Sequence, residues 1–127
     1  MKKVAWVSRH PPLKSQVEAL KQKLGDVQII HIAKTFMDYK EVLSAVKEAG
    51  AKYAVVVLPL SMIALLTEDK GITWLYAIMN AVHDGCIGEN CPLFNPETDV
   101  IMPPNRHLRF FEFKKIKEVR MVLEDWE

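Results

Sequence analysis

The chain has 127 residues, a length that suits one domain built around one core. Apolar residues make up 50% of it, charged residues make up 26%, and the formal net charge is +1, as in an ordinary soluble globular protein. A charge so close to zero excludes a global field that attracts duplex nucleic acid or an anionic membrane, so any anion must be bound by a local group of residues.

The N-terminal residues Met1-Lys2-Lys3 lead directly into a short segment of strand character. No apolar stretch is long enough for a signal peptide or a membrane span, so we expect a cytoplasmic protein with no membrane partner. The two cysteines, Cys86 and Cys91, are too few for a disulfide scaffold.

The first half of the chain alternates segments of strand and helix character. An apolar run predicts a first strand over residues 3–8. A helix follows, whose apolar residues recur at helical spacing on one face, at Leu13, Val17, Leu20 and Leu24. Pro11 or Pro12 can begin this helix, and Gly25 is placed to end it.

A second strand is predicted over residues 27–33, which are rich in β-branched side chains. Asp38 and Glu41 then resemble a capping box that opens a second helix, and Gly50 ends it. Residues 53–58 are apolar throughout, which is typical of a strand covered on both faces.

A third helix is expected after Pro59, with Ser61 as its cap and Gly71 at its end. Strands that alternate with helices predict a parallel sheet with right-handed crossovers. The expected fold is therefore Rossmann-like α/β, with a mainly parallel sheet and helices on both faces, in a single domain over residues 1–127. Neither a Gly-x-Gly-x-x-Gly sequence nor a Gly-Lys-Ser/Thr sequence is present, so a conventional NAD or ATP site is not expected.

The second half has a less regular pattern. Residues 72–82 are apolar and fit either a strand that runs into a helix or one buried helix. Residues 83–104 are rich in Gly, Asn and Pro, which predicts a long, partly irregular loop. Residues 108–113 are aromatic and favour a strand, whereas residues 116–126 fit both periods, and we expect a strand in their first part. This half should thus end in an antiparallel or mixed strand element.

The turn after the first strand carries Ser8, Arg9 and His10. Ligands of open α/β sheets bind outside the carboxyl ends of the strands, which is where this turn belongs. Arg9, Lys14 and the amides near Ser15 at the helix start form a candidate phosphate cradle. His10 is a candidate general acid or base, and Ser8 can orient a phosphate or a ribose hydroxyl. The alternative is a solvated turn in which Ser8 merely ends a strand.

Two further turns carry candidate ligand-binding residues. Pro59 and Ser61 follow the third strand, where Ser61 could hold a second phosphate or serve only as a helix cap. Lys34 and Thr35 follow the second strand, where Lys34 supplies a cation and Phe36 a ring that stacks on a base or belongs to the core. If the strand order is 2-1-3, which the sequence does not determine, the turns after strands one and three face each other across one crevice.

His83, Cys86 and Cys91 are spaced as His-x2-Cys-x4-Cys, and His107 could complete a four-ligand zinc site. Neither pair has a well-known finger spacing, and the cysteines could instead form a disulfide or be unrelated thiols. We therefore expect no metal and no cofactor, and keep the zinc site as an alternative.

A resemblance to a known family rests on two stretches of this chain. Val7-Ser8-Arg9-His10-Pro11, together with the strand that ends in Leu58-Pro59-Leu60-Ser61, resembles small CRISPR-associated proteins with a Rossmann-like, CARF-related fold. Some of these proteins are ring nucleases, which degrade cyclic oligoadenylate second messengers. The resemblance covers residues 4 to about 65, and Pro12 stands where a glycine is expected, which removes one amide donor.

The resemblance implies a homodimer with a cyclic oligoadenylate or another small nucleotide as ligand. It further implies a metal-independent reaction in which a ribose 2′-hydroxyl attacks the adjacent phosphate. Arg9 would stabilise the developing charge and His10 would move a proton. Two alternatives remain, namely a nucleotide sensor without catalysis and an accessory interaction protein of an archaeal virus or plasmid.

Overall fold

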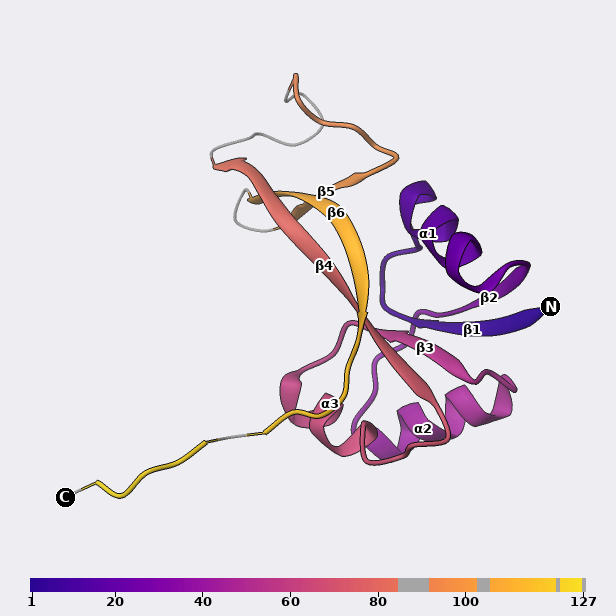
Figure 1. Ribbon diagram of the computed structural model, residues 1–127, viewed down its shortest axis with the longest axis vertical. Helices are drawn as coiled ribbons and strands as arrows, with labels where there is room; N and C mark the ends of the chain where they lie inside the picture. The colour runs from indigo at the N-terminus through magenta and orange to yellow at the C-terminus, as the bar shows by residue number, and fades with distance from the viewer. Residues whose placement is uncertain (85–91, 103–105, 121, 127) are drawn as a thin grey trace.

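The computed structural model describes residues 1–84, 92–102, 106–120 and 122–126 (Figure 1). In these ranges the elements follow one another as β1 (Lys2–Val7), α1 (Lys14–Leu24), β2 (Val27–Ile32), α2 (Tyr39–Glu48), β3 (Tyr53–Val56), α3 (Leu60–Leu66), β4 (Thr73–Asp84), β5 (Asp99–Met102) and β6 (Arg106–Lys115). The protein is thus α/β, and its first half follows the predicted alternation closely.

The strands form one mixed sheet of six strands in the order β2-β1-β3-β4-β6-β5. The first four of these strands are parallel to one another, whereas β6 is antiparallel to both β4 and β5. The order of the first three strands is thus 2-1-3, the condition under which the turns after strands one and three face each other. An antiparallel strand element in the second half is confirmed.

Helices cover both faces of the parallel part of the sheet (Figure 1). Alternate residues of β1 point to opposite faces, so Val4 and Trp6 pack with Leu20 of α1, while Ala5 and Val7 pack toward α2 and α3. All four of these β1 side chains are buried. This two-sided burial explains why the strand is a continuous apolar run in the sequence.

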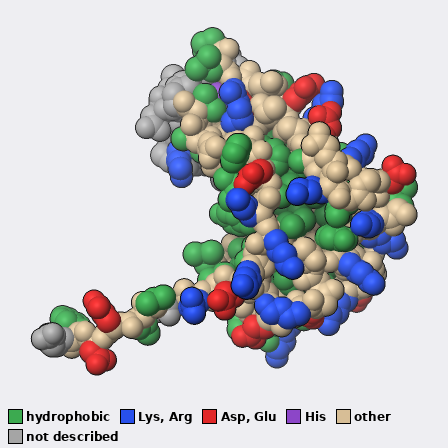
Figure 2. Space-filling model, viewed as in Figure 1, with side chains coloured by type: hydrophobic (Ala, Val, Ile, Leu, Met, Phe, Trp, Pro, Cys, Tyr) green, Lys and Arg blue, Asp and Glu red, His purple; other side chains and the backbone are tan. Residues whose placement is uncertain are grey.

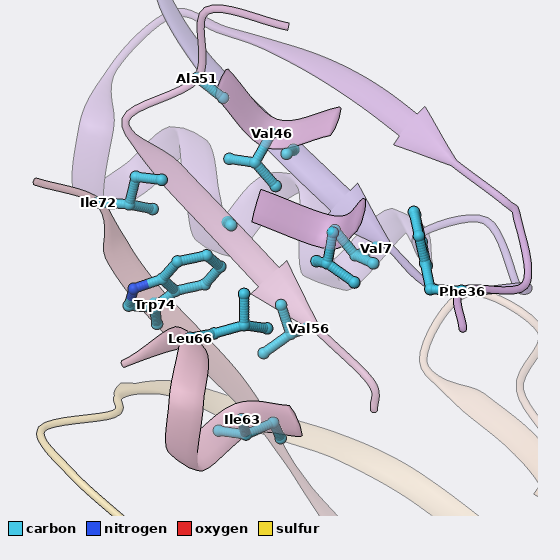
Figure 3. Close-up of a cluster of buried hydrophobic side chains, with 12 residues drawn as sticks. Val7, Phe36, Val46, Ala51, Val56, Ile63, Leu66, Ile72 and Trp74 are labelled. Carbon is cyan, nitrogen blue, oxygen red and sulfur yellow. The ribbon is translucent and has the colours of Figure 1, made fainter. Parts of the chain in front are cut away.

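The larger core cluster lies between the sheet and the pair α2 and α3 (Figure 3). Its helical members are the buried side chains of one face of each helix, Val42, Val46, Ile63 and Leu66. Trp74 of β4 closes the cluster, and its indole Nε1 donates a hydrogen bond to the backbone oxygen of Asp69 at 3.0 Å.

Helix ends agree with the sequence for α1 and α2 but not for α3. Gly25 and Gly50 follow α1 and α2 with φ of 79° and 71°, the region that glycine adopts most readily. Ser61 is not a cap, because the oxygen of Pro59 already accepts hydrogen bonds from the backbone nitrogens of Met62 and Ile63. Gly71 does not end α3 either, since the helix stops at Leu66 and a turn through Asp69 follows.

The second half contains the largest differences from the sequence prediction. Residues 72–82 contain no helix; they belong almost entirely to β4, which pairs with β3 at its start and with β6 along most of its length. Part of the predicted loop, residues 83–104, is the end of β4 and all of β5. Residues 116–120 and 122–126 form no strand, because they extend beyond the last paired residues of the sheet.

No helix in the described part of the chain has the length and apolar character needed to cross a membrane.

Candidate functional site

A hollow of about 280 Å³ lies where β1, β2 and β3 end. Because these strands are parallel, their carboxyl ends meet at one edge of the sheet and the turns that follow lie together. The lining residues come from all three turns and from the start of α3, and they are Val7, Ser8, Arg9, Lys34, Thr35, Phe36, Val57, Leu58, Pro59 and Met62. Five predicted site residues, Ser8, Arg9, Lys34, Thr35 and Pro59, are thus brought together.

Two cations border this hollow. Arg9 donates a hydrogen bond from Nη2 to the Thr35 hydroxyl at 2.9 Å, which joins the turn after β1 to the turn after β2. Lys34 places its ammonium nitrogen 5.5 Å from the centre of the Phe36 ring. Among the described residues, neither cation forms an ion pair with a carboxylate. The hollow therefore combines an apolar floor with two cations that remain available to an anion.

The backbone of the Ser8 turn is held on both sides. The Ser8 hydroxyl accepts a hydrogen bond from the His10 backbone nitrogen at 3.2 Å, and His31 Nε2 donates to the Ser8 backbone oxygen at 2.8 Å. His31 is an exposed residue of β2, and its ring supports the turn after β1. The register of β1 and β2, which places His31 opposite Trp6, makes this contact possible, and the sequence alone does not reveal that register.

His10 lies beside the hollow and does not line it. Its backbone oxygen accepts a hydrogen bond from Trp6 Nε1 at 2.9 Å, and Trp6 belongs to the cluster on the α1 face of the sheet. Phe36 and Met62, which line the hollow, pack on the opposite face. The backbone of His10 therefore contacts the cluster on the α1 face of the sheet, whereas the hollow lies toward the face covered by α2 and α3. His10 itself is exposed.

The start of α1 does not contribute to the hollow. Lys14 forms an ion pair with Glu97 at 3.4 Å, and the Ser15 backbone nitrogen donates to the Glu97 backbone oxygen at 3.1 Å. The Leu13 nitrogen donates to Gln16 Oε1 at 2.8 Å. The groups that the sequence assigned to a phosphate cradle at the start of α1 thus contact other residues of the chain and lie outside the hollow. Ser61 is exposed and also lies outside the lining.

A second polar cluster lies between β5 and β6. The buried carboxylate of Asp99 accepts hydrogen bonds from Thr98 Oγ1 and from His107 Nε2, both at 2.6 Å. Arg109 donates to both of its oxygens, at 2.7 and 3.0 Å, and the Asn95 backbone nitrogen donates at 2.9 Å. Burial raises the pKa of Asp99, but these hydrogen bonds outweigh burial and hold the pKa well below its ordinary value.

The Asp99 cluster also bears on the zinc alternative. His107, the fourth candidate ligand, is fully buried and hydrogen-bonded to Asp99. Cys86 and Cys91 lie outside the described residues, as does the side chain of His83. In the part of the chain that is described, no group of three or more His, Cys, Asp or Glu residues is arranged to hold a metal ion.

Comparisons of this chain with protein-family models, with curated proteins and with solved structures find no match.

Proposed function

We propose that the hollow at the ends of β1, β2 and β3 binds a phosphorylated nucleotide, with a cyclic oligoadenylate as the ligand that the family resemblance implies. The observation that carries the proposal is the pair Arg9 and Lys34, which border one hollow without a carboxylate partner in the described residues. Arginine binds phosphate through several N–H donors at once, and within the described part of the chain Arg9 uses one of its donors, on Nη2, for Thr35.

The position of the hollow supports the same proposal. In the sheet, β2 lies on one side of β1 and β3 lies on the other side, so the strand order changes direction at β1. Nucleotides bind at such a switch point in Rossmann-like proteins, and we treat residues 2–75 as a unit of that kind because β2, β1, β3 and β4 are parallel. The volume is close to the lower limit of about 300 Å³ for small-molecule sites, which suits one nucleotide unit of a larger ligand.

The test is a binding titration with labelled cyclic tetra- and hexa-adenylate in EDTA. We expect Arg9→Ala to weaken binding by about tenfold or more, since a hydrogen bond to a charged group contributes roughly 1.5–3 kcal/mol. Lys23→Ala, which removes an exposed cation near the end of α1, is the matched control and should leave the dissociation constant unchanged. If the wild type and Arg9→Ala bound the ligand with equal affinity, the ligand would not bind in this hollow and the proposal would be wrong.

Cleavage of the bound ring is a second candidate function, which the family resemblance implies. Its general acid or base would be His10, which follows Arg9 in the chain but does not line the hollow. Hydrogen bonds with Ser8 and Trp6 fix its backbone nitrogen and oxygen next to Arg9, while its imidazole stays exposed. In the proposed reaction, a ribose 2′-hydroxyl attacks the adjacent phosphate and displaces the 5′-oxygen. His10 takes the 2′ proton or donates one to the leaving oxygen, and Arg9 stabilises the charge on phosphorus. The product is linear and ends in a 2′,3′-cyclic phosphate.

Mass spectrometry of the products formed in EDTA separates cleavage from binding. A ring nuclease gives linear products, and His10→Ala slows their formation by about 10²–10⁴-fold while the dissociation constant stays the same. Intact rings that remain bound identify a sensor without catalysis. A protein that neither binds nor cleaves the rings fits the third hypothesis, an accessory interaction protein.

A further inference from the structure

The C-terminal segment carries large apolar side chains that no other part of the described chain covers. Residues 117–120 and 122–126, here called the arm, follow β6 and extend away from the body (Figure 1). Along it, Val122, Leu123 and Trp126 are 86%, 79% and 99% exposed. Figure 2 shows that hydrophobic and acidic side chains occupy this extension. Such a run of exposed apolar residues is typical of an interaction segment.

An apolar hollow lies at the root of the arm. Here called the α3 hollow, it has a volume of about 260 Å³ and is lined by Leu60, Ile63, Tyr76, Lys114, Ile116 and Val119. Several of its side chains are large and exposed, among them Leu60 and Tyr76. Because the arm starts beside this hollow and extends away from it, its own tip is carried out of reach. From Ile116 to Trp126 the extended chain spans roughly 33 Å at about 3.3 Å per residue.

Charge is distributed unequally between the root and the tip of the arm. The root carries Lys114, Lys115 and Lys117, and of these Lys114 already pairs with Glu112 at 2.9 Å. Glu118 and Arg120, which follow, pair with each other at 4.0 Å, and the tip carries Glu124 and Asp125 next to Trp126. Within one copy these opposite charges are separated by most of the length of the arm. Two arms that run antiparallel bring the acidic tip of each copy to the basic root of the other.

We propose that two copies of this chain associate by exchanging their arms. The tip of each arm, with Trp126, enters the α3 hollow of the other copy, and its carboxylates lie beside the lysines at the root. The arrangement is two-fold and closed, because each copy contributes one arm and one hollow. It buries Val122, Leu123 and Trp126 of each arm together with Leu60 and Tyr76 of the other copy.

The first measurement is sedimentation velocity of the full chain between about 1 and 100 µM, the range in which a modest interface dissociates. We expect a monomer at the low end and a dimer at the high end. Iodide quenching gives a second signal, because Trp6 and Trp74 are buried and only Trp126 of the three tryptophans is exposed. Its quenching should decrease as the dimer forms.

Two variants test the two sides of the contact. Trp126→Glu alters the arm and Leu60→Glu alters the hollow, and both positions are exposed, so the fold should persist in each. We expect each variant to raise the dimer dissociation constant by at least about tenfold. Met37→Glu places the same charge at an exposed apolar residue between β2 and α2 and should leave dimerisation unchanged.

Mixing the two variants distinguishes exchange from any other dimer. Trp126→Glu keeps an intact hollow, and Leu60→Glu keeps an intact arm. A heterodimer of the two variants therefore has one contact in which both sides are intact. We expect an equimolar mixture to form heterodimers more readily than either variant forms homodimers. A monomer at every concentration, or a dimer insensitive to both variants, would overturn the proposal. A mixture that dimerises no better than its components would also overturn it.

Discussion

Asp99 is the residue on which the β5–β6 region depends most directly. Its side chain is fully buried, and donors from Thr98, His107, Arg109 and the Asn95 backbone surround both oxygens. A buried carboxylate without partners is strongly destabilising, and these donors offset the cost of burying the charge of Asp99. The cluster thereby fixes residues 95–99 against β6. This is the same segment whose Glu97 contacts the start of α1.

We predict that Asp99→Asn lowers the free energy of unfolding by roughly 3 kcal/mol at pH 7, the size seen when one partner of a buried ion pair is removed. The pKa of Asp99 is lowered in the folded state, so its contribution is present above the ordinary carboxyl pKa of about 3.9 and decreases as the pH falls below it. The difference between wild type and variant should therefore shrink toward pH 2. Urea unfolding at several pH values measures this, and a difference independent of pH would contradict it.

At the scale of single elements, α2 and α3 begin in different ways. Asp38 accepts a hydrogen bond from the Glu41 backbone nitrogen at 3.1 Å, and Glu41 accepts one from the Met37 nitrogen at 2.8 Å. The side chains at the start of α2 thus satisfy free backbone donors, as the sequence predicted. In α3 the residue at the equivalent position is Pro59, which has no side-chain acceptor, and Ser61 lies inside the first turn.

We predict that Asp38→Ala lowers the free energy of unfolding by about 1 kcal/mol, because a helix-capping side chain is lost. Ser61→Ala is the matched control, and its effect should stay within about 0.5 kcal/mol, as for an exposed residue with no special role. Denaturant unfolding followed by circular dichroism measures both. If Ser61→Ala cost as much as Asp38→Ala, Ser61 would be the cap and α3 would begin two residues later than in the structure.

At the scale of the whole molecule, the two halves of the chain share one core. Phe113 of β6 packs in the cluster formed by β1, α1 and β3, with its ring 6.0 Å from Trp6 in an edge-to-face arrangement. The register of β4 and β6 shifts at Ile78 and Met79, and Phe111 has no paired residue there. Phe110 and Phe113 consequently have adjacent rings, 4.8 Å apart.

We therefore predict that the chain unfolds in a single transition, as one domain over residues 1–127. Circular dichroism and the fluorescence of the buried tryptophans should give the same midpoint in urea. Phe113→Ala should shift both signals together by roughly 2 kcal/mol, less than for a fully buried phenylalanine because this side chain is half-buried. Two separate transitions would show that the antiparallel part folds independently.

Sequence patterns determined the parallel half of this protein and part of its site. Runs such as residues 53–56 and the helical spacing from Leu13 to Leu24 are local signals, and they placed each element to within a few residues. The location of Arg9, Lys34 and Pro59 at one edge also followed, because parallel strands end together. The ligand and the reaction remain proposals.

Tertiary structure alone decided the rest. The apolar pattern of residues 72–82 fits either a helix or a strand. Residues 73–84 form a strand because they pair with both β3 and β6. His10 and the start of α1 were separated from the hollow by contacts with Trp6 and with Glu97, which is more than eighty residues away. The sequence by itself fixed what depends on neighbours along the chain. What depends on partners distant in the chain, such as the sheet register and the use of free backbone amides, was decided only when the chain folded.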